Sequence, residues 1–214
     1  MATPYPLVLA SASPRRREIL EALGVPYVVR ASDVAEAPLG GEPAVATAKR
    51  LAVEKAAQVA ANARERLVVG ADTVVVHQGT ILGKPADDAE AAAMLRRLRG
   101  RRHDVVSGVA VIDRHSGRTL VEALATAVWM REYGDDEVAR YIARGEPFDK
   151  AGAYAIQDPH FRPVDRIDGC YLNVVGLPLC LLLSLLWQAG VPVPPPAPDR
   201  VRPLCPSCVL LPDG

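Results

Sequence analysis

Short apolar runs alternate along the chain with longer segments in which apolar positions recur at helical spacing. The runs 7–10, 27–31 and 67–76 predict strands. Two hairpins are predicted, one joining 103–113 to 119–130 and one joining 166–167 to 171–174 around an Asp-Gly pair. Residues 81–82 should pair back on the strand before them. Helices are expected over residues 14–23, 44–63, 88–99, 135–143 and 179–189.

This order of elements contains both crossovers and hairpins, which predicts an α/β domain with a mixed sheet. We expect one domain over residues 1–190. Residues 191–214 are rich in Pro and should form an extended or disordered tail. The tail carries Cys205 and Cys208 at C-x-x-C spacing, but no second pair or nearby His completes a zinc site. We therefore expect a solvated thiol pair there.

Composition narrows the functional classes. Lys+Arg and Asp+Glu both number 25, and this balance argues against a general nucleic-acid coat or a polybasic membrane binder. Hydrophobic residues make up 50% of the chain, enough for a sizeable core. No signal peptide is visible, and the most apolar stretch, 174–187, is shorter than a membrane span. We expect a soluble, cytoplasmic protein.

Asp72 is the most informative single residue. It lies in the run 67–76, where the other side chains are apolar, small or Thr. Because burying an unpaired carboxylate is very costly, Asp72 must be hydrogen-bonded, ion-paired or beside a metal. Gly70 just before it indicates a bend or a close backbone approach. We favour a catalytic or metal-linked role; a buried Asp that caps a neighbouring loop is the alternative.

The segment Ser11–Arg17 predicts an anion site where a strand leads into a helix. Backbone N–H groups at a helix N-terminus favour anions, and Arg side chains suit phosphate oxygens. Positive charges in the first turn oppose the helix dipole, and phosphate binding accounts for them. Of the three Arg in the segment we favour Arg15 and Arg16. A basic surface turn is the alternative.

Three further residues are weaker candidates. Lys84 lies on a rigid Gly-Lys-Pro loop, and Gln157 follows an apolar segment from which its amide could read a base edge. Glu36, in an acidic loop, could share Mg²⁺ with a polyphosphate. The sequence has no nucleophile elbow and no Walker P-loop, and nothing marks a His as a base. The remaining groups suit metal-assisted attack of water on a phosphoanhydride.

Five segments occur in one order along the chain: LASASPRR at 9–16, GADT at 70–73, GKP at 83–85, DKAGAYAIQ at 149–157 and NVVGLP at 173–178. Together they resemble the Maf family of nucleoside triphosphate pyrophosphatases over about residues 7–187. The resemblance implies a curved mixed sheet flanked by helices, with two lobes around a nucleotide cleft. It implies hydrolysis of a nucleoside triphosphate to a monophosphate and pyrophosphate, with a divalent metal (Mg²⁺ or Mn²⁺), often in a homodimer.

The resemblance also implies roles for single residues. Asp72 resembles the family's proton acceptor, and Glu36, with Asp72, would hold the metal. Positions tied to substrate choice match Arg15, Thr73 and Gln157. Other positions lining the cleft match Ser11, Arg16, Glu36, Lys55 and Lys84. Arg supplies all but four of the 25 positive charges, so Lys55, Lys84 and Lys150 in matched segments indicate sites that need a compact ammonium.

The segment 149–154 resembles the branch that prefers dTTP and UTP over the branch that acts on 7-methyl-GTP. Asp158 stands where we expect Gly after Gln157, so a pyrophosphatase for 7-methyl-GTP or ITP-type nucleotides stays an alternative. A nucleotide sensor that restrains division without turnover is another, and the intact Asp72 argues against it. The expected partner is a nucleoside triphosphate, with no nucleic-acid polymer and no membrane.

Overall fold

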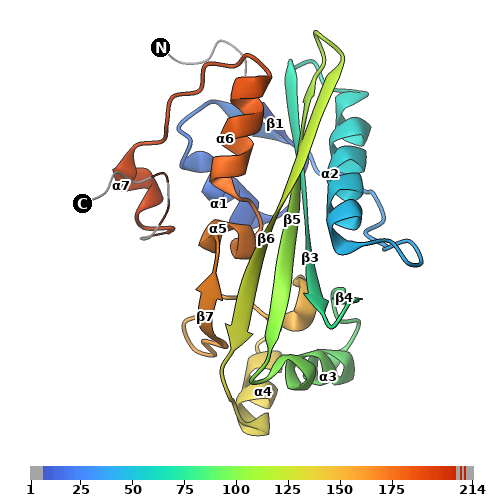
Figure 1. The fold of residues 1–214 in the computed structure, drawn as a ribbon, viewed down its shortest axis with the longest axis vertical. Helices are drawn as coiled ribbons and strands as arrows, with labels where there is room; N and C mark the ends of the chain where they lie inside the picture. The colour runs from blue at the N-terminus through green and yellow to red at the C-terminus, as the bar shows by residue number, and fades with distance from the viewer. Residues whose placement is uncertain (1–6, 206–207, 209, 211–214) are drawn as a thin grey trace.

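The computed structural model describes residues 7–205, 208 and 210 of the chain (Figure 1). Its centre is a seven-stranded mixed sheet with the order β2-β1-β3-β5-β6-β7, in which β4 pairs with β3. The strands are β1 (Leu7–Leu9), β2 (Tyr27–Val29), β3 (Leu67–His77), β4 (Thr80–Leu82), β5 (Arg102–Asp113), β6 (Arg118–Met130) and β7 (Val164–Asp168). The helices are α1 (Pro14–Glu21), α2 (Ala44–Ala60), α3 (Asp88–Leu98), α4 (Asp135–Ile142), η1 (Ala151–Ala153), α5 (Tyr171–Val175), α6 (Leu179–Gln188) and α7 (Pro198–Val201). The predicted α/β class with a mixed sheet is confirmed.

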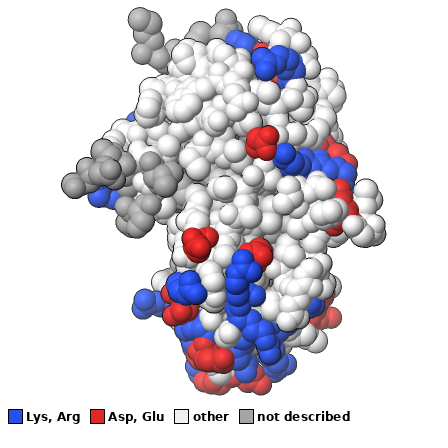
Figure 2. Space-filling model, in the orientation of Figure 1, with Lys and Arg blue, Asp and Glu red and all other residues white. Residues whose placement is uncertain are grey.

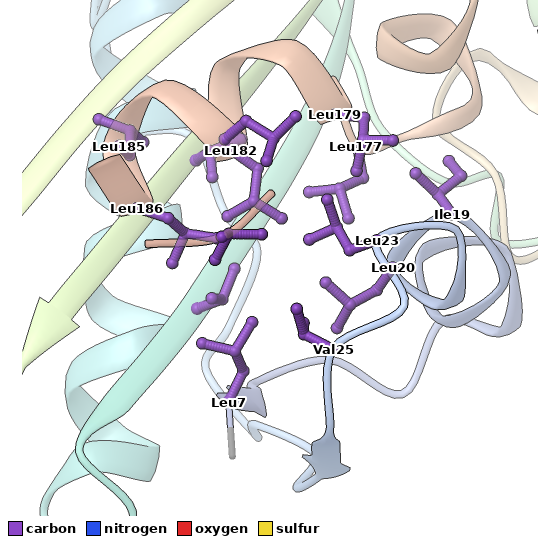
Figure 3. Packing of buried hydrophobic residues seen from close by; sticks show 14 of the residues in the cluster. Leu7, Ile19, Leu20, Leu23, Val25, Leu177, Leu179, Leu182, Leu185 and Leu186 are labelled. Atoms are coloured by element: carbon purple, nitrogen blue, oxygen red, sulfur yellow. The ribbon is translucent and has the colours of Figure 1, made fainter. Parts of the chain in front are cut away.

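Helices cover both faces of the sheet where β1 and β3 run parallel (Figure 1). On one face Leu7, Leu9 and Val69 pack with α1 and α6, and Figure 3 shows Leu7 with the leucines of those helices. On the other face Val8 and Val68 pack against α2. Successive side chains of a strand point to opposite faces, and here both faces are buried. This is why β1 and β3 are apolar almost throughout.

A second core lies at the other end of the sheet. It packs α3, α4 and η1 against the ends of β3, β5 and β6, with Leu95, Tyr141 and Phe161 among its buried residues. Strands β5 and β6 continue from the first core into the second (Figure 1). Figure 2 shows that charged residues on the viewed face gather at this end, with both signs interspersed. The cleft described below lies between the two cores.

Two glycines bring α2 directly onto the backbone of the sheet. A Cβ at Gly70 of β3 would lie 2.1 Å from the Ala52 carbonyl oxygen, and one at Gly108 of β5 would lie 2.2 Å from that of Ala48. The close backbone approach predicted at Gly70 is therefore present. Gly108 pairs with Asp72 across the two strands, so α2 packs directly over this part of β3.

The predicted hairpin around Asp168-Gly169 is wrong. Strand β7 ends at Asp168, and the chain then forms the helix α5 instead of a returning strand. Tertiary contacts hold this segment: the Asn173 Nδ2 group donates to the Val105 carbonyl and to Thr126 Oγ1, at 3.0 and 2.9 Å. These contacts with β5 and β6 replace pairing with a strand. They join residues that are far apart in the sequence, so the local turn pattern does not predict them.

The first part of the tail packs on the domain and does not extend into solvent. Val191, Val193 and Val201 are buried in the first core, and Val201 is the last residue of the short helix α7. Cys205 and Cys208 are buried as well, at 4% and 8% exposure, so the expectation of solvated thiols is wrong. Apolar residues spaced between the prolines make this packing favourable. No helix in the described residues is long and apolar enough to cross a membrane.

Candidate active site

All the side chains that the sequence singles out for binding or catalysis line one cavity of about 770 Å³. They are Ser11, Arg15, Arg16, Glu36, Lys55, Asp72, Thr73, Lys84 and Gln157. The cavity is bounded by the start of α1, the loop before α2, α2 itself, β3 and the segment around η1. Residues far apart in the sequence therefore converge in one place, as the predicted cleft requires.

Lys55 joins the two candidate carboxylates at the floor of the cavity. Its Nζ atom lies 2.5 Å from Asp72 Oδ1 and 2.5 Å from Glu36 Oε1. Asp72 and Lys55 are each only 4% exposed. The buried Asp72 is thus ion-paired, as its position in an apolar strand demands, and it does not cap a loop.

Glu36 receives a second cation from the rim of the cavity. Lys84 Nζ lies 2.5 Å from Glu36 Oε2, so both carboxylate oxygens of Glu36 accept from an ammonium group. Partial burial would raise the pKa of Glu36, but the hydrogen bonds from Lys55 and Lys84 outweigh it and hold this pKa at about 2. The loop that carries Glu36 is therefore tied to α2 and to the loop after β4.

The start of α1 forms as predicted. Ser13 is the N-cap, its Oγ accepts from the Arg16 backbone N–H at 3.4 Å, and Pro14 occupies the first turn. Arg15 Nη1 lies 3.3 Å from Asp149 Oδ2 across the cavity. Arg17 does not line the cavity, so the geometry agrees with the choice of Arg15 and Arg16.

Arg16 is held by three acceptors of the protein. Its Nε donates to the Gly176 carbonyl at 2.9 Å, Nη1 to Ser11 Oγ at 3.3 Å and Nη2 to Thr73 Oγ1 at 3.2 Å. Burial lowers the pKa of Arg16, opposed by the charges of Asp72 and Glu36. A guanidinium has five N–H groups, so one on each Nη stays free of these bonds to the described residues. Such a pair suits the oxygens of a phosphate.

Asp158, the departure from the expected Gly, does not line the cavity. Its Oδ2 lies 2.6 Å from Arg144 Nη2, and its Oδ1 accepts from the backbone N–H groups of His160 and Phe161 at 3.0 and 2.6 Å. Burial would raise the pKa of Asp158, but these bonds lower it. Asp158 thus closes its own loop, while the exposed Gln157 next to it lines the cavity.

Comparison with known proteins gives the family. The family model described as "Maf-like protein" matches residues 6–189. The chain belongs to the Maf family. A dTTP/UTP pyrophosphatase of Thermomicrobium roseum is 50% identical over 207 residues, 96% of this chain and 94% of that protein. A dTTP/UTP pyrophosphatase of Geobacter sulfurreducens is 50% identical over 184 residues, 86% of this chain and 96% of that protein.

The carboxylates of this Maf-like protein fit a divalent ion that arrives with a polyphosphate. In the described residues no group of three or more His, Cys, Asp or Glu gathers to hold a metal. Glu36 and Asp72, however, flank one cation position, which the Lys55 ammonium fills. Mg²⁺ is commonly held by one or two carboxylates together with substrate phosphates. These two carboxylates would be part of such a donor set when a phosphate is bound.

Several cavity residues of this Maf-like protein were not assigned a role from the sequence. Asp149 Oδ1 lies 2.6 Å from Lys150 Nζ, and Asp149 Oδ2 faces Arg15. The Lys150 ammonium is therefore ion-paired within its own segment. Tyr154 lines the cavity, and its hydroxyl lies 2.7 Å from His103 Nε2. Burial lowers the pKa of His103 to about 3, so this His is neutral near pH 7 and a weak base. Asp149 and Tyr154 both belong to the motif at 149–157, and this motif is the sequence feature that points to them.

Proposed function

We propose that this chain hydrolyses dTTP and UTP to the nucleoside monophosphate and pyrophosphate. Relatives 50% identical over most of the chain carry the name dTTP/UTP pyrophosphatase. The observation that carries the proposal is the buried Asp72–Lys55 pair, joined to Glu36 and lying beside Arg16 in one cavity. It combines a carboxylate fit for base catalysis with cations fit for a triphosphate.

The cations bind the phosphates in this proposal. Arg16 offers two N–H groups from a guanidinium that three protein acceptors already orient. Lys84 lies at the more exposed rim, where its side chain is 48% exposed and free to turn to a ligand. Arg15 faces Asp149, which is itself 61% exposed, so a phosphate competes with a weakly held partner. Neutralising the phosphate charge lowers the barrier to attack at phosphorus.

Asp72 is the proposed general base. A water beside its carboxylate gives a proton to Asp72 as the water oxygen attacks the α-phosphorus, and the bond from that phosphorus to the bridging oxygen breaks to release pyrophosphate. Base catalysis of this kind contributes roughly 10²- to 10⁴-fold in rate. Glu36 and Asp72 would hold the divalent ion (Mg²⁺ or Mn²⁺), which supplies charge neutralisation at the phosphates when bound.

The placement of Asp158 is compatible with a pyrimidine preference. Asp158 was the reason to consider 7-methyl-GTP or ITP-type substrates, and its carboxylate is engaged by Arg144 and by its own loop. Arg15, Thr73 and Gln157, the positions tied to substrate choice by the family resemblance, all line the cavity. We further propose that the protein works in the cytoplasm as a homodimer, without a nucleic-acid polymer or a membrane as partner.

A panel of dTTP, UTP, ITP and 7-methyl-GTP, each with Mg²⁺ and with detection of released pyrophosphate, tests the proposal. We expect multiple turnovers with the highest kcat/KM for dTTP and UTP. Faster turnover of ITP or 7-methyl-GTP would transfer the assignment to another branch. Binding without pyrophosphate release from any of the four would favour the nucleotide sensor.

A further inference from the structure

Ser107 lies directly behind the cleft and has no role in the proposed mechanism. It sits on β5 opposite Thr73 of β3, and the two hydroxyl oxygens are 2.8 Å apart. Ser107 is fully buried at 0% exposure and does not line the cavity, whereas Thr73 does. Ser107 therefore acts on a substrate only through the residues that its hydroxyl contacts, of which Thr73 lines the cavity.

The neighbours of Ser107 fix the direction of this hydrogen bond. Ser107 Oγ lies 3.0 Å from the backbone carbonyl oxygen of Asn173. A carbonyl has no proton to give, so the single hydroxyl proton of Ser107 is donated to Asn173. The Thr73 hydroxyl then has two acceptors within reach, Ser107 Oγ at 2.8 Å and the Gly176 carbonyl at 3.4 Å, and its proton goes to the nearer one, Ser107. The lone pairs of Thr73 are left to accept, and one of them receives Arg16 Nη2 at 3.2 Å.

The result is a hydrogen-bond relay that runs one way, from Arg16 to Thr73 to Ser107 to the Asn173 carbonyl. Its far end is rigid, because Asn173 is fully buried and its amide group donates to Val105 and Thr126. Three residues further along, the Gly176 carbonyl accepts Arg16 Nε. A side chain at Gly176 would be strained by its φ of +129°, so glycine is needed where this carbonyl turns toward Arg16.

We propose that Ser107 is a positioning residue for the proposed phosphate hydrolysis. By taking the proton of Thr73, it keeps Thr73 an acceptor, and this holds the Arg16 guanidinium with its free N–H groups available to the phosphates. The inference rests on the proposed function for its effect on turnover. It rests on the hydrogen bonds alone for its effect on Thr73.

Two substitutions separate hydrogen bonding from packing. Ser107→Ala removes the hydroxyl, while Ser107→Cys fills a similar volume with a weak donor and acceptor. We expect both to lower kcat/KM for UTP by about 3- to 10-fold, the equivalent of one buried hydrogen bond. Wild-type kcat/KM in Ser107→Cys would show that Ser107 only fills space and would overturn the proposal.

Tyr133→Phe is the matched control. The Tyr133 hydroxyl is also buried and donates to a backbone carbonyl, that of Leu95, at 2.7 Å. It lies in the second core and does not line the cavity. The control should lower the thermal midpoint by a similar amount but leave kcat/KM for UTP unchanged. An equal fall in kcat/KM in both variants would reduce Ser107 to a general structural role.

A double-mutant cycle with Thr73→Val tests the path of the effect. If Ser107 acts through Thr73, Ser107→Ala in the Thr73→Val background should change kcat/KM by less than about 2-fold, because the relay is already broken. Additive losses would overturn the proposal. The thermal midpoints of the same four proteins test the relay without a substrate: the double variant should lose less than the sum. Absence of turnover in the wild-type protein would instead refute the proposed function.

Discussion

Removing the charge of Lys55 is the sharpest stability test of the site. Lys55→Met keeps an unbranched apolar stem and deletes the ammonium that joins Asp72 to Glu36. Glu36 still has Lys84, but among the described residues Asp72 is ion-paired with Lys55 alone, and Asp72 is only 4% exposed. The substitution therefore leaves a buried carboxylate without its counter-charge.

Removal of one partner from a buried ion pair costs about 3–5 kcal/mol. In a chain of this size each kcal/mol lowers the thermal midpoint by about 2–4 °C, so the expected fall is about 6–20 °C. Urea unfolding at pH 7 gives the free energy directly. Lys49→Met is the matched control, because Lys49 pairs with Glu122 at 2.9 Å with both side chains partly exposed. That surface pair should contribute only about 0–1 kcal/mol.

A second substitution decides whether the loss comes from the unpaired charge. Lys55→Met combined with Asp72→Asn removes both members of the pair and should recover most of the stability, since replacing a buried ion pair with neutral groups is often near neutral. The reasoning is refuted if Lys55→Met costs no more than Lys49→Met, or if adding Asp72→Asn lowers stability further.

Two further predictions concern the carboxylates of Glu36 and Asp158. The pKa of Glu36 is about 2, below its ordinary value of 4.5, so the ionised group stabilises the fold above pH 4.5 and this stabilisation is lost as the pH falls toward 2. The difference in unfolding free energy between wild type and Glu36→Gln should therefore shrink from pH 4.5 to pH 2. A constant difference would contradict the prediction. Asp158→Asn should lower stability by about 1–3 kcal/mol, because it weakens the bonds to Arg144, His160 and Phe161. The same variant should keep the wild-type order of kcat/KM across the nucleotide panel, and a reversed order would place Asp158 in substrate choice.

The sequence predicts best where one physical requirement dominates. Strands buried on both faces must be apolar, so β1 and β3 are visible as runs. A carboxylate inside such a run must have a partner, and this requirement singles out Asp72 from the sequence alone. The start of α1 could be predicted as an anion site, because the arginines in its first turn oppose the helix dipole.

Prediction failed where the deciding partner is distant in sequence. The segment after Gly169 has the local pattern of a hairpin, yet contacts of Asn173 with β5 and β6 make it a helix. The tail is rich in Pro, but Val191 and Val201 bury against the first core. Ser107 was unremarkable in the sequence, because its role depends on a cross-strand neighbour and on the Asn173 carbonyl.

Pyrophosphate release by Asp72→Asn tests the central claim most directly. The amide keeps the shape of Asp72 and can still accept from Lys55, so the variant should fold and bind UTP, as nucleotide-dependent shifts of the thermal midpoint would show. It cannot take a proton from water, so we expect kcat for UTP with Mg²⁺ to fall by about 10²- to 10⁴-fold. Folded Asp72→Asn that binds UTP and releases pyrophosphate at nearly the wild-type rate would contradict the account.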